Sequence, residues 1–436
     1  KIRKMKQLAF IISFLTACLS ANAQQLVLTR QQCRERALKH NEQISMDAID
    51  TERAELDRKI AWVHYLPQVD GNALGLYTKD QDMMNMKLQM RGMYMAGLTV
   101  QEPLYVGGKI TTGVKLAEVG IDVSRQQQRK TRMQVISDVD KAYFTLISVQ
   151  QKIKMIEAYR RQLEEVNQQI DKSIEADLAI ANDKVRVDAK LSEINYQLQK
   201  ARNGETLCRL SLCDVMGEPL DREIIPADTT FHIAAPSAMD ENVADRPEME
   251  MLRLGIKAKE LQMKMSRADM LPTVALAGGY SYYGGIKLKG AMQAADGNVY
   301  PFEQKMNGGI PMVGLVVKVP IFHWGIEQKK VKKAKMDVDR ARLDYQHVGR
   351  QLGIEARQAV QNVTDGYNMV QTAVKGQAQA DENLRVMRTK YDNGLATLTD
   401  LLDAESQWQS SHSTLIEAQT QYMIYLTEYK RVTAKL

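Results

Sequence analysis

The segment GLTVQEPLYVGGK (Gly97–Lys109) recurs in altered form as GLVVKVPIFHWGI (Gly314–Ile326), about 217 residues later. Both copies begin with Gly-Leu and then continue to a proline, an aliphatic residue, an aromatic residue and a glycine. Each copy follows a stretch of alternating apolar residues and precedes a long stretch with helical periodicity. The chain therefore repeats one unit, in which a strand gives way to a long helix.

Two further pairs of segments extend this internal similarity. LPQVDGNALGLY, from Leu66, resembles LPTVALAGGYSYYG, from Leu271. DLAIANDKVRVDAKLSE, from Asp177, resembles GLATLTDLLDAESQ, from Gly394, again about 217 residues later. Each repeat thus reads as helix, strand, strand, long helix, long helix.

The sequence predicts four consecutive parts. They are a signal peptide (1–23), a first repeat (24–216), a connector (217–247) and a second repeat (248–436). Prolines interrupt the connector, as is typical of a segment that joins two regular structures.

The first 23 residues have the composition of a secretory signal peptide. Four basic residues precede an apolar run from Leu8 to Leu19, and Ala21-Asn22-Ala23 offers a small-residue cleavage site before Gln24. The sequence leaves one alternative open, in which the segment ending at Cys18 is a lipobox and Cys18 carries a lipid. Either reading predicts an exported protein.

Charge and cysteine content argue against two classes of protein, those that bind nucleic acid and those built on disulfides. The formal net charge is +6, but four positive charges lie in the signal peptide, which leaves a balance near +2. This balance gives no basic footprint for nucleic acid. Three cysteines remain (Cys33, Cys208, Cys213), and an odd count argues against a disulfide framework. No apolar run of 18 residues follows the signal peptide, so no membrane-spanning helix is expected.

The clearest pattern in the second repeat is a long helical stripe. Apolar residues recur at steps of three and four from Val331 to Tyr391, which is the spacing of a coiled-coil seam. Many seam residues are alanines, so neighbouring helices can approach closely. A helix from Ile326 to Tyr391 would be about 100 Å long. The first repeat predicts a similar helix from Lys109 to about Glu175, and helices of this length need lateral partners.

Four stretches of alternating apolar residues predict β-strands. They lie at about 69–78, 94–104, 273–283 and 312–322. Each has about the length that crosses a bilayer as a tilted barrel strand. Four strands cannot close a barrel, and an open edge is not tolerated in lipid. Three chains would supply twelve strands, an even number within the bacterial range.

No catalytic constellation is present in the sequence. The six histidines are scattered and never stand at zinc spacing, and GGKIT at Gly107 lacks the upstream glycine of a phosphate-binding loop. Methionines cluster at 83, 84, 86, 90, 93 and 95. Thioethers favour Cu(I), but methionine also fills irregular space, and this segment contains no accompanying cysteine or histidine. We therefore predict no cofactor and no enzyme.

Several motifs in their order resemble the TolC family of outer-membrane efflux ducts. The quoted segments are LVLTRQQCRERALKHNEQI (Leu26–Ile44), LCRLSLCDVMGEPL (Leu207–Leu220), RPEME (Arg246–Glu250), YDNGLATLTDLLDAES (Tyr391–Ser406), and the paired LPQV/LPTV and proline-aromatic-glycine segments. The resemblance covers nearly the whole mature chain and rests on the set, since each motif alone is weak.

The resemblance implies a fold of class α+β. In it, a homotrimer forms a twelve-stranded β-barrel in the outer membrane and a twelve-helix coiled-coil tunnel in the periplasm. The two copies of the opening motif would then be the corners where a strand meets a tunnel helix. Pro103 and Pro320 suit strand ends, and Gly108 and Gly325 allow a sharp change of direction.

Asp400 and Asp403 are the sharpest candidate site. Their spacing puts both on one face of a helix just after a turn at Gly394. Acids in a first helical turn also complement the helix dipole, which accounts for Asp400 better than for Asp403. The resemblance implies that both line the periplasmic mouth, and that Tyr391 and Asp183 make bonds between helices there.

Two departures from the family pattern stand out near this predicted mouth. The first repeat has Asp177 where the second has Gly394. Ala396 stands where the best-known member has an arginine, so the corresponding salt bridge is not expected.

The resemblance implies a passive exit duct of a tripartite efflux or type I secretion system. It would lie in the outer membrane and periplasm of a Gram-negative bacterium and conduct small molecules or peptides. Its partners would be outer-membrane lipids, a periplasmic adaptor and an inner-membrane pump of the RND, ABC or MFS type. The alternative is a secreted, soluble coiled-coil scaffold.

Overall fold

The computed structural model describes residues 26–83, 86–175, 180–293 and 297–436. The predicted signal peptide with Cys18, and also Met84 and Asp177, lie outside the described residues. Among the helices that are described, none is both long and apolar enough to cross a membrane.

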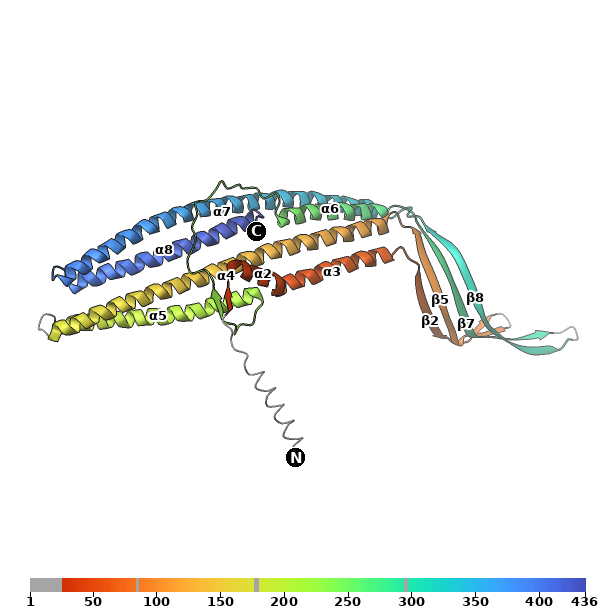
Figure 1. The fold of residues 1–436 in the computed structure, drawn as a ribbon. Helices are drawn as coiled ribbons and strands as arrows, with labels where there is room; N and C mark the ends of the chain where they lie inside the picture. The colour runs from red at the N-terminus through yellow and green to blue at the C-terminus, as the bar shows by residue number, and fades with distance from the viewer. Residues whose placement is uncertain (1–25, 84–85, 176–179, 294–296) are drawn as a thin grey trace, which may run out of the picture. The chain divides into compact units, whose positions relative to one another are not determined.

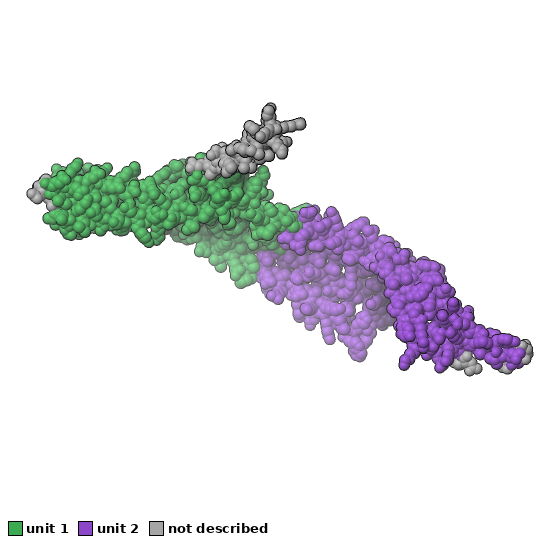
Figure 2. Space-filling view, turned by 90° about the horizontal axis from the view of Figure 1, so that it is seen from below, with its two compact units in different colours: residues 1–49, 125–251, 346–436 green, residues 50–124, 252–345 purple. Residues whose placement is uncertain are grey.

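The chain divides into two compact units (Figure 2). Unit 1 comprises residues 1–49, 125–251 and 346–436, and unit 2 comprises residues 50–124 and 252–345. These units differ from the two sequence repeats, because each unit contains segments of both repeats. The repeats are therefore defined by sequence similarity, whereas the units are defined by contacts within the folded chain.

Unit 2 contains an antiparallel sheet of four long strands, which run side by side in Figure 1. They are β2 (Gln68–Tyr77), β5 (Arg91–Tyr105), β7 (Thr273–Gln293) and β8 (Val299–Lys318), paired in the order β2–β5–β7–β8. A small hairpin of β3 (Gln81–Met83) and β4 (Met86–Gln89) also pairs with β7, through β4. Cross-strand contacts join both repeats in one sheet, since β5 comes from the first and β7 from the second.

Both outer strands of this sheet have one open edge within the described chain. There, β2 pairs only with β5, and β8 pairs only with β7. The side chains on both faces of β8 are also exposed, including Leu315 at 61%, Val316 at 51% and Val317 at 54%. A strand with a free edge and exposed apolar side chains on both faces tends to pair with another chain in water.

The second hairpin is longer than the sequence patterns predicted. The third strand was expected to end at residue 283, but β7 continues to Gln293 because β8 supplies partners back to Val299. The fourth strand was expected over 312–322, whereas β8 ends at Lys318, which pairs with the first residue of β7, Thr273. No partner remains beyond that point, and Pro320 has no N–H to donate.

The strand-to-helix junctions contain backbone in the left-handed region. Gly108 has φ +79° and Gly325 has φ +71°, and the next residue of each begins a helix. Pro103 lies in β5 at a register shift, and Pro320 lies two residues after β8. Glycine adopts this conformation without steric cost, so the chain can turn directly from strand into helix.

The helices repeat with the spacing of the opening motif. Their bounds are α2 (Arg30–His40), α3 (Glu42–Val63), α4 (Lys109–Glu175), α5 (Ala181–Met216), α6 (Pro247–Ala268), α7 (Ile326–Asp392) and α8 (Leu398–Val432). Both α4 and α7 have 67 residues, and their first residues are 217 positions apart. The repeat is therefore in register through its longest element.

Unit 1 is held together by seams between long helices. Along the contact of α7 with α8, the buried residues of α7 include Ala356, Ala359, Val363 and Val370, which pack against Tyr422 among others. Figure 1 shows the two helices running alongside each other. The predicted coiled-coil seam is confirmed here, and its small residues allow the close approach.

A second core in unit 1 joins the N-terminal segment to the connector. β1 (Leu26–Leu28) pairs in parallel with β6 (Ile224–Pro226). Tyr143 of α4 is fully buried beneath them, and its hydroxyl lies 2.9 Å from the Asp228 carboxylate. Cys33 and Cys213 are buried as free thiols in the same core. Both thiols therefore act as small apolar residues.

Gly217 provides a test of the end of α5. It has φ +65°, and a Cβ there would lie 2.4 Å from the carbonyl oxygen of His40. Gly217→Ala should lower the free energy of unfolding by more than the roughly 1–2 kcal/mol that left-handed backbone costs. Urea titrations followed by circular dichroism measure this. Gly204→Ala, inside α5 with open space at its Cβ, is the matched control and should not destabilise.

Candidate gate at the helix ends

One end of unit 1 brings together the residues that the sequence singled out. Asp183 lies in the first turn of α5, Tyr391 is the last residue but one of α7, and Asp400 and Asp403 lie in the first two turns of α8. At this end α4 and α7 finish and α5 and α8 begin (Figure 1). We call this region the helix tip.

An apolar cluster fastens the four helices together at the tip. Its buried members are Val166 and Ile170 of α4, Val187 of α5, Leu384 of α7, and Leu398, Leu401 and Ala404 of α8. Tyr391 packs at its edge. The side chains of the candidate gate are therefore positioned by apolar packing among all four helices.

The turn between α7 and α8 depends on Gly394. Its φ is +71°, its N–H donates to the Tyr391 carbonyl at 2.9 Å, and the next N–H, of Leu395, donates to the Lys390 carbonyl at 2.8 Å. This is the pattern that closes a helix with a left-handed residue. No atom lies within 4 Å of a Cβ built at Gly394, so the requirement here is conformational rather than steric.

Asp400 forms part of the cap of α8. The backbone N–H of Asp400 donates to the Thr397 hydroxyl oxygen at 3.2 Å, and the Asp400 carboxylate accepts from the Thr397 N–H at 2.9 Å. The Thr397 hydroxyl also donates to this carboxylate at 2.7 Å. This bond, together with the one from the Thr397 N–H, holds the pKa of Asp400 below its ordinary value. This carboxylate is therefore ionised and has a structural task.

Asp403 has a different environment. It is exposed, one turn further along α8, and the described residues offer it no hydrogen bond or ion pair. Of the two acids, Asp403 is the one whose charge is not already engaged by the fold.

Tyr391 and Asp183 lie near each other, and no hydrogen bond joins them within the described residues. Tyr391 is half-buried. Burial raises the pKa of its hydroxyl, and the negative charges of Asp183 and Asp392 raise it further. The hydroxyl thus stays protonated and can donate to a carboxylate.

Contacts that the sequence did not predict also cross between helices at the tip. Arg186 of α5 donates to the Thr399 hydroxyl of α8 at 2.7 Å. Arg388 of α7 forms an ion pair with Glu165 of α4 at 2.7 Å. Ala396 supplies no arginine, but Arg186 reaches across from the other repeat. These contacts join residues 213 and 223 positions apart, so no local sequence signal indicated them.

Glu405 is the other tip residue that sequence reasoning missed. It lies on α8, is 1% exposed, and its Oε2 has no hydrogen-bond partner among the described residues. Burial raises its pKa to about 7, against the attraction of Arg388 and Lys190. It follows Leu398 and Leu401 at steps of three and four, so it occupies a position on the apolar stripe.

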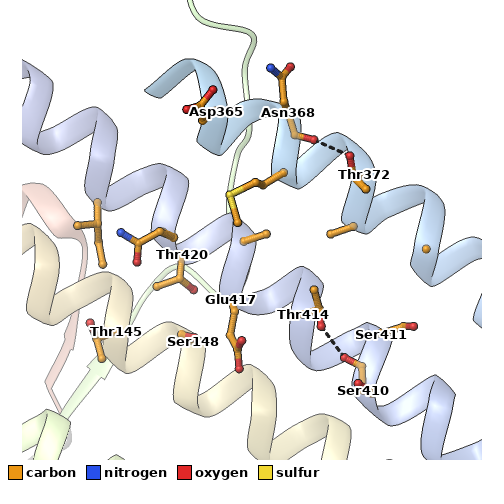
Figure 3. A pocket seen from close by; sticks show the side chains of 16 residues that line it. Thr145, Ser148, Asp365, Asn368, Thr372, Ser410, Ser411, Thr414, Glu417 and Thr420 are labelled. Carbon is orange, nitrogen blue, oxygen red and sulfur yellow. Dashed lines mark hydrogen bonds between the residues drawn. The ribbon is translucent and has the colours of Figure 1, made fainter. Parts of the chain in front are cut away.

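A groove of about 1080 Å³ lies further along unit 1, between α4, α7 and α8 (Figure 3). Hydroxyl side chains line much of it. The hydroxyls of Thr372 and Thr414 donate to the carbonyls of Asn368 and Ser410, four residues earlier in their own helices. These two hydroxyl donors are thus used within their own helices.

Within the described residues, no group of three His, Cys, Asp or Glu residues could hold a metal ion. His412 Nε2 lies 2.9 Å from Asp381 Oδ1, which also accepts from Trp408 Nε1 at 2.7 Å. This cluster joins α7 to α8.

Glu405 predicts a pH dependence of stability. Its pKa rises from 4.5 to about 7 on folding, so the folded protein binds more protons between these values. The free energy of unfolding should be fully supported below about pH 4.5 and fall as the pH rises to 7, by up to about 1.4 kcal/mol per unit. Glu405→Gln should remove this component in urea titrations across that range.

Glu382→Gln is the matched control, because this exposed glutamate has its pKa lowered by Arg385. It should retain the decline between pH 5 and 7. Equal slopes for wild type and Glu405→Gln would show that the buried carboxyl does not titrate there.

The family model for outer membrane efflux proteins matches residues 33–206 and 238–431. The chain is 21% identical over 347 residues to the alkaline protease secretion protein AprF of Pseudomonas aeruginosa, covering 76% of this chain and 67% of that protein. It is 19% identical over 350 residues to the outer membrane protein TolC of Vibrio cholerae, covering 78% and 76%.

A solved structure shares the fold. The Campylobacter jejuni CmeC outer membrane channel matches with a TM-score of 0.75 and 18% identity, covering 93% of this chain and 85% of that one. Its fold agrees with the α+β class expected from the sequence.

The family match spans most of both repeats, and it decides between the two functions that the sequence left open. The members of the family are transport channels. The resemblance to the TolC family is confirmed. The protein is an exit duct that lies in the outer membrane and periplasm of a Gram-negative bacterium. The chain belongs to the outer membrane efflux protein family.

Proposed function

We propose that three copies of the chain assemble into a duct with a twelve-stranded barrel and a twelve-helix tunnel. The observation that carries this proposal is the pair of open edges on the four-stranded sheet, β2 on one side and β8 on the other. In lipid each unpaired N–H and C=O costs several kcal/mol, so both edges need partners.

A closed ring of chains satisfies both edges at once. If β8 of one chain pairs with β2 of the next, every long strand has two neighbours and no edge remains. Three chains give twelve strands, and a cyclic assembly uses the same contact at each junction. The exposed apolar side chains on β8 would then face lipid on one side of the barrel.

The duct acts by passage rather than by chemistry. We infer that it is not an enzyme and that it carries small molecules or peptides outward from an inner-membrane pump through a periplasmic adaptor. The name of the Pseudomonas relative, a protease secretion protein, supports a polypeptide cargo. The family name supports efflux. The inner-membrane pump would be of the RND, ABC or MFS type.

The helix tip acts as the gate in this proposal. Closure rests on contacts between repeats, namely Arg186 with Thr399, Arg388 with Glu165, and Tyr391 beside Asp183. In a trimer, Asp400 and Asp403 form two stacked rings of carboxylates. Crowded negative charges attract cations, so the resting mouth selects cations.

Oligomeric state tests the assembly. Native mass spectrometry of the full chain in detergent should give a trimer, because only a closed ring covers both sheet edges. Spectra that contain only monomer or dimer would reject the proposal.

Conductance tests the gate. In planar bilayers, Asp403→Asn should reduce cation selectivity with little change in open probability, because Asp403 is exposed and makes no cap. Arg186→Gln should raise open probability and leave selectivity unchanged, because it removes the hydrogen bond between α5 and α8. Tyr391→Phe should do the same, because it removes the hydroxyl that we propose donates to Asp183 in the assembled duct. If Asp403→Asn and Asp400→Asn together leave selectivity intact, the constriction lies elsewhere.

A further inference from the structure

The start of α7 carries an unusual concentration of lysines. Five exposed lysines occur within seven residues, at positions 329, 330, 332, 333 and 335. Lys330 forms an ion pair with Glu327 at 3.3 Å. The other four have no hydrogen bond or ion pair to any described residue, and no acid lies between Lys329 and Lys335. We call these five residues the lysine cluster.

The lysine cluster lies mainly on the face of α7 opposite its apolar stripe. At 3.6 residues per turn, Lys329, Lys332 and Lys333 project from one face. Val331, Ala334 and Val338 project from the opposite face, and Val338 is only 3% exposed. Lys330 and Lys335 flank the lysine face. The positive charges are thus gathered on the side of α7 that its own chain does not cover.

The fold itself does not require this charge. The 217-residue offset matches 329–335 with 112–118 in α4, where the sequence TGVKLAE holds one lysine and one glutamate. That helix forms equally well. Lysines three and four residues apart repel one another, and positive charge near a helix N-terminus opposes the helix dipole. The lysine cluster therefore weakens α7 in isolation and calls for an anionic partner.

A second, independent feature adjoins the lysine cluster. Trp324 has φ +54°, a left-handed conformation that is costly for a bulky residue. Its counterpart in the first repeat is Gly107, with φ +65°. Trp324 is nevertheless 80% exposed, as are Phe322 at 69% and Ile321 at 90%. A strained and exposed tryptophan, where glycine serves in the other repeat, points to an external partner for its indole.

We propose that this corner binds anionic phospholipid of the outer membrane, with the apolar residues entering the interface and the lysine cluster holding lipid phosphates. The proposal rests on the proposed function, which puts the strands of unit 2 in the membrane and α7 on its periplasmic side. Tryptophan favours the membrane–water interface, and clustered lysines attract anionic headgroups. This asymmetric corner would occur three times around a trimer.

The spacing along the helix suits this role. Lys329 to Lys335 lie 5 to 11 residues after Trp324 in the sequence, or about 8–17 Å along a helix at 1.5 Å per residue. Helical side chains lean toward the N-terminus, which here is the direction of the apolar corner. Long lysine side chains can therefore return their ammonium groups to the headgroup layer.

Native mass spectrometry with lipid tests the proposal. The full chain in detergent is incubated with equal amounts of phosphatidylglycerol and phosphatidylethanolamine, and the retained lipids are counted. Wild type should retain phosphatidylglycerol preferentially. The triple variant Lys329→Gln, Lys332→Gln, Lys333→Gln should reduce that preference by roughly fivefold or more. Added salt should weaken the wild-type preference.

The control variant removes the same number of positive charges at exposed helical positions of unit 1, with Lys154→Gln, Lys200→Gln and Lys375→Gln. It should keep the wild-type preference. Trp324→Gly should lower retention of both lipids without changing their ratio.

Two results would overturn the proposal. One is a wild type without preference for phosphatidylglycerol. The other is a triple variant that keeps the preference, which would leave the lysine cluster to a partner such as an acidic protein surface. The protein mass in the same spectra reports the oligomeric state, so a failed trimer is recognised separately from a failed lipid site.

Discussion

Lateral packing between long helices is the constraint on which unit 1 depends. A helix of 67 residues with a polar outer surface gains most of its stability from an apolar stripe that another helix covers. The seam of Ala356, Ala359 and Val363 lets α8 lie close to α7, and the tip cluster adds α4 and α5. The residues of the proposed gate share one end of the unit only because this packing holds four helix ends in place.

Three acids within one and a half turns of α8 show how environment assigns different tasks to similar side chains. Asp400 is ionised and caps its own helix through Thr397. Asp403 is exposed and makes no hydrogen bond or ion pair to the described residues. Glu405 is buried in the apolar stripe, where desolvation raises its pKa to about 7. One short segment of α8 thus holds a capping acid, an exposed acid and a buried acid.

The two repeats agree where packing is shared and differ where each meets its own surroundings. α4 and α7 have equal lengths and the same offset as the opening motif. β7 and β8, with 21 and 20 residues, exceed β2 and β5, with 10 and 15. The corner before α7 carries Trp324 and the lysine cluster, whereas the corner before α4 carries Gly107. Duplication therefore preserved the scaffold and left loops and corners free to specialise.

The sequence by itself determined the repeat, the long helices, the seam and the approximate position of the four long strands, because these follow from local periodicity and from glycine and proline chemistry. It also indicated Asp400 and Asp403, which share a helical face by spacing alone. Tertiary structure decided the rest. β7 extends to Gln293 because β8 offers partners for pairing. Arg186 donates a hydrogen bond to Thr399, which is 213 residues away in the sequence. Glu405 is desolvated because packed helices bury it. Pairing, reach across helices and desolvation each depend on residues distant in the chain, and no local pattern contains them.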